Sequence, residues 1–340
     1  MRHIVSMQLK HVLITGGTGS FGSAMAERLL MEPAVERITV FSRDEFKQHE
    51  MRTRFHSPKL SFVIGDVRDR DAVADTVGGV DAIFHAAALK SVPTGEFFPM
   101  EDVRTNTIGT HNILDAAEKA GVKRVIVLST DKAVQPINVM GMTKALAEKM
   151  VEAKGRNMAT ATVFATTRYG NVMGSRGSVI PHFIGQIKGG EDITVTNPDM
   201  TRFLLSLEGA IELVLFALEH AQQGDLFIRK APASTVDVLA KAVLDIFGAK
   251  NPTRIIGTRG GEKLHETLAT GIELTSAEDM GDYFRIPKIV TSLDYERFYE
   301  EGLIKKKVAE DYTSENTTRL DIEATKELLL KQPFVRDALK

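Results

Sequence analysis

The stretch Thr15–Gly22 reads TGGTGSFG and stands between an apolar run, His11–Thr15, and a predicted helix. Its glycines fit G-x-G-x-x-G in one frame and the variant T-G-x-x-G-x-x-G in another. Such glycines allow a tight turn and a close approach to a ligand, and the following helix N-terminus offers free N–H groups to a pyrophosphate. A purely structural glycine turn is the competing interpretation. The residues predicted to contact a dinucleotide are Gly16, Thr18, Gly19, Ser20, Phe21 and Gly22.

The chain around this stretch alternates short apolar runs with longer helical segments. Each run is rich in Val, Ile and Leu on both faces, as in parallel strands that helices cover on both sides. Alternating β and α units with right-handed crossovers build a doubly wound parallel sheet. We therefore predict an α/β protein with a Rossmann sheet of about seven strands. The runs are His11–Thr15, Arg37–Ser42, Leu60–Gly65, Asp81–Ala87, Arg124–Thr130, Thr160–Gly170 and Gly224–Lys230.

The alternation becomes irregular in the second half of the chain, where a Gly- and Pro-rich segment precedes a tail of short predicted helices and strands. We expect a smaller mixed α/β lobe to be built from these pieces and to bind substrate. The predicted division assigns residues 1–172 and 203–228 to the dinucleotide-binding domain, and residues 173–202 and 229–340 to the smaller lobe.

The composition limits the class of protein. The chain has 340 residues, 43% of them hydrophobic, a formal net charge of −2 and no cysteine. This balance gives no indication of a nucleic-acid or membrane partner, and the lack of cysteine excludes disulfides and cysteine-ligated metals. No run approaches the ~18–20 apolar residues that cross a bilayer. We predict a soluble, cytoplasmic protein without a metal site.

The end of the second predicted strand bears on the choice of cofactor. An acid there would bind the ribose hydroxyls of NAD and repel a 2′-phosphate. The chain instead has Ser42 and Arg43, with Lys47 one turn later, which favours the phosphate of NADP. Asp44 is the argument for NAD. Asp66 follows the third strand, where it can accept from the adenine amine; the other predicted contacts are Val67, Ala86, Ala87 and Ala88.

The fifth predicted strand leads into the residues that carry chemistry. Thr130, Asp131 and Lys132 stand at its C-terminal end, where open α/β sheets bind their ligands. The next segment reads PINVMGMTK, in which Met140 and Lys144 have the spacing of a Y-x-x-x-K pair. A thioether carries no proton, so the acid/base work that a tyrosine would do must fall to other groups. A plain ion pair of Asp131 with Lys132 is the competing interpretation.

Nine stretches occur in an order that resembles a known family: ITGGTGSFG, FSRDE, IGDVRD, HAAALK, LSTDKA, PIN, RYGNVMGSRGSVIP, DMTRF and GTRGGEKLHE. They resemble the extended short-chain dehydrogenase/reductase enzymes that dehydrate UDP-N-acetylglucosamine at C4 and C6. PINVMGMTK, which has methionine where many of these enzymes have tyrosine, resembles the motif of one subgroup. That subgroup also epimerises C5, on the route to UDP-N-acetyl-L-fucosamine for surface polysaccharides such as capsule. The resemblance implies tightly bound NADP and a cycle of C4 oxidation, C5 deprotonation, C6 dehydration and hydride return.

The resemblance also implies roles for the site residues. Lys132 is then the C5 base, Asp131 the acid that assists departure of the C6 hydroxyl, and Thr130 a hydrogen-bond partner of the 4-hydroxyl. Lysine acts as a base only if its pKa falls from ~10.4 toward neutrality, and we expect burial or Lys144 to lower the pKa of Lys132. Lys132 itself, or a water beside Met140, is expected to deprotonate the 4-hydroxyl.

Further residues are assigned by the same resemblance. Lys144 holds the nicotinamide ribose, and Asn106 resembles an asparagine that stabilises the helix beside the cofactor. Cations and amides of the smaller lobe are expected to bind the diphosphate, ribose and uracil. These predicted substrate contacts are Lys90, Arg168, Asn171, Arg176, Ser178, Val179, Arg202, Arg259 and Glu262.

Two other functions remain open on the sequence. A UDP-sugar 4-epimerase of the same fold would oxidise and reduce C4 only, although that class normally uses the missing tyrosine. A non-catalytic NADP-binding regulator would explain Met140 most simply, but has no need of Asp131, Lys132 and Lys144. The fold usually forms dimers through two helices, here expected in Asn106–Gly121 and Val139–Ala153, and relatives assemble dimers into a hexamer.

Overall fold

The computed structural model describes residues 9–156, 159–175, 177–288 and 308–340. Its centre is a nine-stranded sheet in the order β13-β14-β9-β6-β5-β4-β1-β2-β3, of which the seven strands from β3 to β9 are parallel. These seven are the predicted ones, so the doubly wound α/β fold is confirmed. Their bounds are β1 His11–Thr15, β2 Arg37–Ser42, β3 Leu60–Ile64, β4 Ala82–His85, β5 Arg124–Leu128, β6 Val163–Arg168 and β9 Leu226–Arg229.

Two strands beyond the prediction extend this sheet. β14 (Tyr283–Ile286) pairs antiparallel with β9, and β13 (Glu278–Asp279) pairs antiparallel with β14. Both come from the range that the sequence assigned to the smaller lobe, so the tail of the chain returns to the main sheet. Both strands are short, so their sequences show no alternating pattern from which a strand could be predicted.

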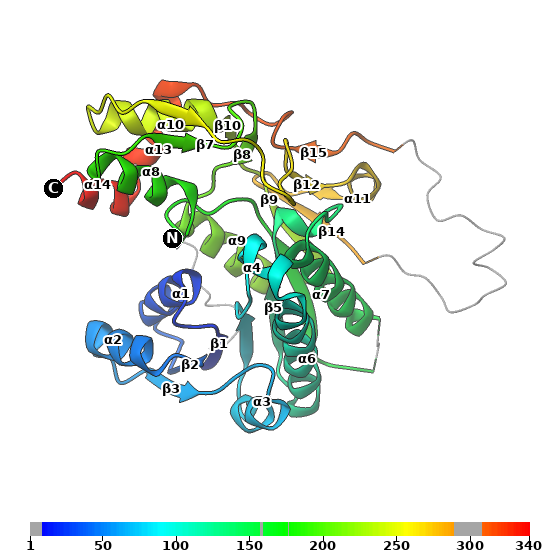
Figure 1. Ribbon diagram of the computed structural model, residues 1–340. Coiled ribbons are helices and arrows are strands. Elements are labelled where there is room, and N and C mark those ends of the chain that lie inside the picture. The colour runs from blue at the N-terminus through cyan, green and yellow to red at the C-terminus, as the bar shows by residue number, and fades with distance from the viewer. Residues whose placement is uncertain (1–8, 157–158, 176, 289–307) are drawn as a thin grey trace.

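Helices cover both faces of the sheet (Figure 1). Successive residues of a strand point to opposite faces; accordingly Val12 and Ile14 of β1 pack in one apolar cluster with α1 and α9, whereas Leu13 packs in another with α3 and α6. This two-sided burial is why the parallel strands are apolar throughout. The helices of this part are α1 Ser20–Leu30, α2 Glu45–Phe55, α3 Arg70–Val77, α4 Val92–Phe97, α5 Pro99–Asp102, α6 Gly109–Ala120, α7 Val139–Gly155 and α9 Leu207–His220.

The strand order reverses between β1 and β4, because the chain runs outward through β2 and β3 and then returns to β4. In open α/β sheets ligands bind outside the carboxyl ends of the strands at this switch point. The glycine turn after β1 and the Thr130–Lys132 segment after β5 both end up at that edge. The fold therefore brings the two motifs together although more than a hundred residues separate them.

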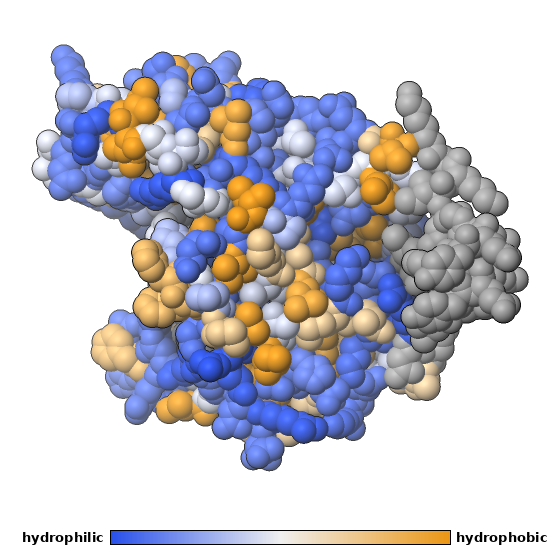
Figure 2. All heavy atoms as spheres, turned by 45° about the vertical axis from the view of Figure 1, so that its right-hand side comes forward, coloured by the Kyte–Doolittle hydropathy of each residue, from blue (hydrophilic) through white to orange (hydrophobic). Residues whose placement is uncertain are grey.

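The remaining elements form a smaller body above the carboxyl ends of the strands, as Figure 1 shows, with two apolar clusters of its own. The space-filling view in Figure 2 is deeply hollowed on its left side, between this body and the part below it that holds α1 and α2. The elements of the smaller body are α8 Val179–Lys188, β7 Ile193–Val195, β8 Thr201–Phe203, β10 Ala233–Thr235, α10 Val236–Ile246, β11 Thr253–Ile255, β12 Thr267–Ala269, α11 Gly271–Thr275, β15 Tyr312–Thr313, α13 Ile322–Leu330 and α14 Pro333–Ala338.

The segment before α6 departs from the predicted helix. Val103–Ile108 forms a π-helical turn, η2, so the α-helix proper begins only at Gly109. Such turns inside helices often accompany functional sites, and this one carries Asn106. Within the described residues, no helix has the length and apolar character needed to span a bilayer.

Candidate active site

The glycine turn after β1 fits closely against the end of β4. Gly16 has φ +64°, and a Cβ on it would lie 2.7 Å from the Cα and N of Ala87. Only glycine tolerates both the left-handed backbone and this approach. Gly19 precedes α1 and offers no side chain to cap it, so the first N–H groups of α1 are available to an anion. The turn thus has the cradle that a pyrophosphate needs.

The predicted contacts around this turn differ in what they can offer a ligand. Phe21 of α1 packs partly against the apolar cluster on its face of the sheet, and Ser20 is half-buried at the start of the helix. Thr18 is buried and donates to Ser42 Oγ at 3.0 Å, which ties the turn to the end of β2. Gly22 lies against Gly17, where a Cβ would clash.

The cationic end of β2 is already engaged with carboxylates. Arg43 lies 3.4 Å from Asp66 Oδ2, and Lys47 forms an ion pair with Asp44. Asp66 also takes hydrogen bonds from Arg68, and these outweigh the effect of burial and lower the pKa of its carboxyl. The strand ends thus bring together the residues that were predicted around the adenosine. A 2′-phosphate would have to draw Arg43 and Lys47 from these partners.

Three small residues follow β4 as predicted, with Ala86 and Ala87 half-buried and Ala88 exposed. His85, directly before them, is fully enclosed and hydrogen-bonds the hydroxyls of Thr15 at 2.7 Å and Thr110 at 3.0 Å. Burial, aided by the charge of Lys144, lowers the pKa of His85 to about 3. A neutral histidine with both ring nitrogens engaged is a packing residue and not a proton carrier.

Two residues predicted to contact the cofactor, Asn106 and Val67, are engaged with other parts of the protein. Asn106 is fully buried; its amide oxygen accepts from Leu89 N at 2.8 Å, and its amide nitrogen donates to Leu89 O and to Thr143 Oγ1. It therefore fastens the segment after β4 to the start of α7, with no polar atom left for a cofactor. Val67 packs in the apolar cluster and its carbonyl accepts from Asn112, which leaves its side chain to the core.

Asp131 and Lys132 form the polar centre of the site. They open a short 3₁₀ turn, η3 (Asp131–Ala133), that Thr130 caps. Asp131 is buried; its Oδ1 accepts from Thr130 Oγ1 at 2.8 Å and from Lys132 Nζ at 3.0 Å, while Oδ2 has no partner. A buried carboxylate oxygen without a donor costs free energy unless a ligand or water meets it. The pair therefore presents one open acceptor.

The expected pKa of Lys132 is wrong in direction. Burial alone lowers it, but the carboxylates of Asp131 and Glu266, at 3.0 and 3.2 Å from Nζ, raise the pKa above its ordinary value. The pKa of Lys144 does fall, to about 8, because its burial outweighs the opposing charge of Glu148. In this state Lys132 is an ammonium ion.

The helix that carries Met140 and Lys144 is pressed against the catalytic turn. Asn138 caps α7 by accepting from Gly141 N at 2.8 Å, and Gly141 has no room for a Cβ because the Lys132 carbonyl oxygen occupies the place. Met140 is buried, and Lys144 Nζ donates to Leu128 O at the end of β5. Lys144 thus contacts the end of the fifth strand.

One predicted substrate contact is wrong: Arg168 is buried within β6 and has no donor left for a diphosphate. Its guanidinium forms paired hydrogen bonds with Glu148 of α7 and Glu273 of α11 and one to Leu268 O. The charges of the two glutamates outweigh the burial and raise its pKa further above the ordinary value. Arg168 fastens the smaller body to the sheet.

The other predicted substrate contacts come from several elements of the chain. Asn171 Oδ1 and Ser178 Oγ are buried without a partner, which fits a polar ligand beside them. Arg202 of β8 lies 4.0 Å from Glu266. Arg259 is exposed, and its N–H donates to Glu262 Oε2 at 3.3 Å. The remaining members are Lys90 and Val179, which are exposed, and Arg176, which lies outside the described residues.

The sequence analysis missed two charged residues of the site. Glu266 is buried 3.2 Å from Lys132, and Lys263 donates to Val134 O at 2.6 Å, just after the catalytic turn. Both belong to GGEKLHE, in which only Glu262 and the preceding arginine were assigned. No local signal distinguishes Glu266 from Glu262, because both stand in the same polar stretch.

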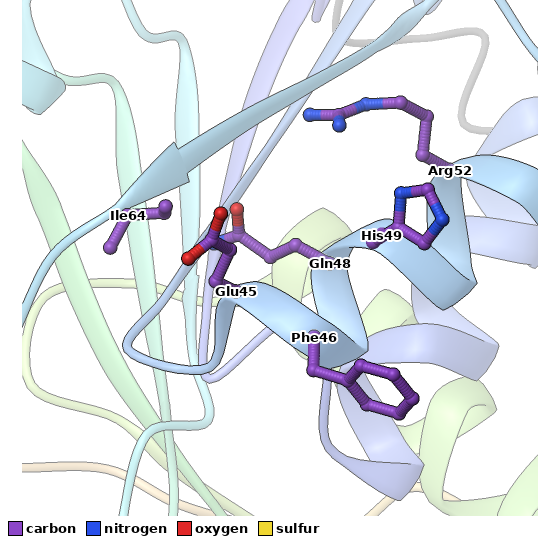
Figure 3. Close-up of a pocket in the computed structure, with 6 residues that line it drawn as sticks. All are labelled: Glu45, Phe46, Gln48, His49, Arg52 and Ile64. Atoms are coloured by element: carbon purple, nitrogen blue, oxygen red, sulfur yellow. The ribbon is translucent and has the colours of Figure 1, made fainter.

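A separate hollow of about 510 Å³ lies between α2 and the end of β3. Figure 3 shows Phe46 pointing away from Ile64, while the Glu45 carboxylate extends toward the side on which Ile64 lies. None of its lining residues was predicted to bind cofactor or substrate. In the parts of the chain that the structure describes, no group of three or more His, Asp or Glu residues is placed to hold a metal ion.

Comparison with known proteins identifies the family of the chain. The family described as "Polysaccharide biosynthesis protein" matches residues 12–288, and "Polysaccharide biosynthesis protein C-terminal" matches residues 291–336. A protein named UDP-glucose 4-epimerase from Rickettsia canadensis is 54% identical over 97% of this chain and 98% of its own, and one from Rickettsia bellii is similarly related.

Two solved structures place the fold. Pen from Bacillus thuringiensis has a TM-score of 0.86 and 35% identity, covering 96% of this chain and 99% of its own. DesIV, a dTDP-glucose 4,6-dehydratase from Streptomyces venezuelae, has a TM-score of 0.69 and 24% identity over 75% of this chain and 86% of its own, a likeness of fold alone. The chain belongs to the polysaccharide biosynthesis protein family, within the extended short-chain dehydrogenase/reductase enzymes.

Proposed function

We propose that this protein is a UDP-N-acetylglucosamine 4,6-dehydratase that also epimerises C5, and that it produces a UDP-4-keto-6-deoxyhexosamine for surface polysaccharide synthesis. The observation that carries the proposal is the Asp131–Lys132 pair at the end of β5, in which Asp131 is buried and Lys132 partly exposed, with Met140 where an epimerase of this fold has tyrosine. An acid and a base side by side are what an elimination needs.

The cofactor we propose is NADP, and the residues present fit it. The Gly16 cradle and the uncapped start of α1 suit the pyrophosphate, Arg43 and Lys47 suit a 2′-phosphate, and Lys144 suits the nicotinamide ribose. When bound, the nicotinamide takes up the C4 hydrogen as hydride and later returns it to C6. The engagement of Arg43 with Asp66 leaves NAD as the alternative cofactor.

The catalytic pair can supply both proton transfers of the elimination. The Lys132 ammonium gives one proton to Asp131, 3.0 Å away, so that an N–H bond breaks and an O–H bond forms. The neutral amine then takes the C5 proton, while the protonated Asp131 gives its proton to the C6 hydroxyl, which leaves as water. Both groups thereby return to their resting charges. This assigns a role to a lysine whose pKa is raised in the free site.

We propose that Thr130 hydrogen-bonds the 4-hydroxyl; its Oγ1 donates to Asp131 Oδ1 at 2.8 Å, beside the proposed acid. We propose that Lys132, or a water beside Met140, receives the 4-hydroxyl proton. The diphosphate and ribose are proposed to meet Arg202, Arg259 and Glu262. The unpartnered amide and hydroxyl oxygens of the loop after β6 are proposed to meet the rest of the UDP-sugar.

A UDP-sugar 4-epimerase is the second candidate, because relatives that are 54% identical bear the name UDP-glucose 4-epimerase. That reaction also begins by oxidising C4 but ends by reducing it from the other face. The epimerase reaction needs no acid at C6, whereas this chain has the carboxyl group of Asp131 beside Lys132. A non-catalytic NADP-binding regulator is the third, and it would turn over no UDP-sugar.

The assembly we propose is a homodimer, the building block of a hexamer, acting in the cytoplasm. Exposed apolar side chains gather on α4, α5 and α7, and Figure 2 shows hydrophobic colour across the middle of this face. A shallow groove of about 280 Å³ between α6 and α7 adjoins them. The exposed residues are Phe97, Phe98, Met100, Ile108, Met142 and Leu146. Light scattering of wild-type and of Leu146→Glu should give a dimer or larger and a smaller species, respectively; equal masses would contradict this interface.

The proposed reaction is tested by mass spectrometry of UDP-N-acetylglucosamine after incubation with the purified protein. We expect the sugar nucleotide to lose the mass of one water. The Lys132→Met variant should not catalyse this loss of water but should still bind UDP, because the proposed role of Lys132 is to transfer protons and not to bind the nucleotide. A product of unchanged mass that chromatographs as the C4 epimer would favour the epimerase instead.

A further inference from the structure

Glu266 reaches the Asp131–Lys132 pair from the smaller body. It stands directly before β12, is 2% exposed, and places Oε1 3.2 Å from Lys132 Nζ. Taking a carboxylate out of water costs several kcal/mol, which a partner charge has to offset. The cations it meets are Lys132 of the catalytic turn, at 3.2 Å, and Arg202 of β8, at 4.0 Å.

The backbone of Glu266 is fixed by the segment that follows β15. Its N–H donates to Ser314 Oγ at 2.8 Å, and Ser314 N–H donates to its carbonyl at 2.8 Å. Ser314 Oγ lies 2.6 Å from Thr201 Oγ1, which in turn lies 2.9 Å from His265 Nδ1. Two loops and a strand therefore hold Glu266 in place, so its approach to Lys132 is not the accident of a free side chain.

The charged groups facing Lys132 come from three elements. Asp131 belongs to the same turn, Glu266 and Lys263 to the loop before β12, and Arg202 to β8. The two carboxylates hold the ammonium from two separate segments. Because opposite charges within ~4–6 Å favour the charged form of a group by 1–3 pKa units, each contributes to keeping Lys132 protonated.

One oxygen of each carboxylate points to a ligand. Glu266 Oε2 and Asp131 Oδ2 are both buried and without a hydrogen-bond partner. Buried carboxylate oxygens usually have a hydrogen-bond partner, and two open oxygens beside the same cation fit a polar ligand there. Lys132 Nζ therefore lies between two carboxylates that each keep one acceptor open.

We infer that Glu266 is a positioning residue of the active site, which, with Asp131, fixes the place of the Lys132 ammonium and keeps it protonated until substrate arrives. The inference rests on the proposed function for the part about substrate. It extends that function by adding Glu266 to the residues that control proton transfer, Asp131 and Lys132. Without Glu266, Lys132 loses its proton at a lower pH and its side chain is free to move.

The test measures the titration of Lys132 itself. Folded protein is reacted with trace acetic anhydride at a series of pH values, and the labelling of the Lys132 peptide is followed by mass spectrometry. In Glu266→Gln we expect the midpoint of labelling to fall by at least about one pH unit, as the loss of a carboxylate at this distance requires. Glu262→Gln removes a carboxylate from the same loop and should leave the midpoint unchanged.

A Lys132 midpoint that is the same in Glu266→Gln and wild-type would overturn the inference. If Glu266→Gln does not fold, Glu266→Asp retracts the carboxylate by one methylene and should give a smaller shift in the same direction; no shift there would equally overturn it. Labelling needs no turnover, so it decides the role of Glu266 even if no UDP-sugar reacts. If dehydration occurs, the alkaline limb of kcat, on which Lys132 loses its proton, should also move to lower pH in Glu266→Gln, which a merely structural residue would not cause.

Discussion

Replacing Gly16 by alanine separates the two demands that the dinucleotide turn makes on its backbone. A Cβ at Gly16 would lie 2.7 Å from Ala87 Cα and N and 2.9 Å from the Ala86 carbonyl carbon, where ordinary contact begins near 3.4 Å. The end of β4 must therefore retreat by about half an ångström or more. Gly79 is a matched control, since it has φ +70° and nothing within 4 Å of an added Cβ.

The expected costs follow from these two geometries. Gly79→Ala carries only the left-handed backbone strain, about 1–2 kcal/mol of unfolding free energy. Gly16→Ala carries the same strain and the overpacking of a tight contact, about 1–3 kcal/mol more. Because the displaced residues form the predicted cofactor wall, the affinity for NADP⁺ should also fall, by tenfold for each ~1.4 kcal/mol lost in the bound state.

Urea unfolding of the two variants measures the first effect, and calorimetric titration with NADP⁺ measures the second. Gly79→Ala should bind NADP⁺ as wild-type does. The reasoning is refuted if Gly16→Ala is no less stable than Gly79→Ala and retains wild-type affinity, because the contact with β4 would then be neither tight nor part of a cofactor site.

Three further outcomes are expected. Gly141→Ala should lower activity and stability together, because its Cβ would displace the Lys132 carbonyl, whereas Gly185→Ala, with open space around it, should be stabilised by about 0.5–1 kcal/mol in urea unfolding; equal behaviour of the two would count against the packing of α7. Arg168→Met should cost about 3 kcal/mol in urea unfolding, since two glutamates lose their cation, and a neutral effect would show that the ion pairs are not held in solution. The pKa of Lys144 falls from 10.5 to about 8, so stability is lost as the pH falls through that interval; relative to Lys144→Met, wild-type should gain on the order of 3 kcal/mol between pH 8 and 10.5, and a pH-independent difference would contradict the shift.

The sheet could be predicted because its strands have a simple physical signature. A parallel strand covered on both faces is rich in apolar residues, as HVLIT and RVIVL are, although β6 ends in Thr166, Thr167 and Arg168. The topology then places everything that follows β1 and β5 at one edge. This is why the sequence predicts that the glycine turn and Asp131–Lys132 lie at the same site, although it gives no distance between them.

The partners of the arginines could not be predicted in the same way. Arg168 ends a strand and resembles a ligand-binding cation in sequence, but Glu148 and Glu273 meet it from 20 residues before and 105 residues after. Periodicity says which face a residue occupies, not which distant charge arrives there. The polarity of a loop residue therefore predicted a binding role where the fold made a buried ion pair.

The direction of the Lys132 pKa failed for the same reason. Burial was anticipated and does act to lower the pKa, but the sign is decided by carboxylates, one adjacent in sequence and one 134 residues later. Glu266 stands in a polar stretch beside Glu262 and Lys263, and nothing local distinguishes the residue that turns inward. Electrostatics at a site depends on such long-range pairs, whereas the fold depends on patterns repeated along the chain.

The most direct test of the proposed reaction is to incubate the protein with UDP-N-acetylglucosamine in D₂O, without added cofactor, and to follow the sugar by proton NMR. The account predicts a new C6 methyl signal with deuterium at C5, since the C5 proton passes through Lys132 and exchanges with solvent, and the coupling pattern then reports the configuration at C5. Appearance of the C4 epimer without a methyl signal, or no change in the sugar even with NADP⁺ present, would contradict it.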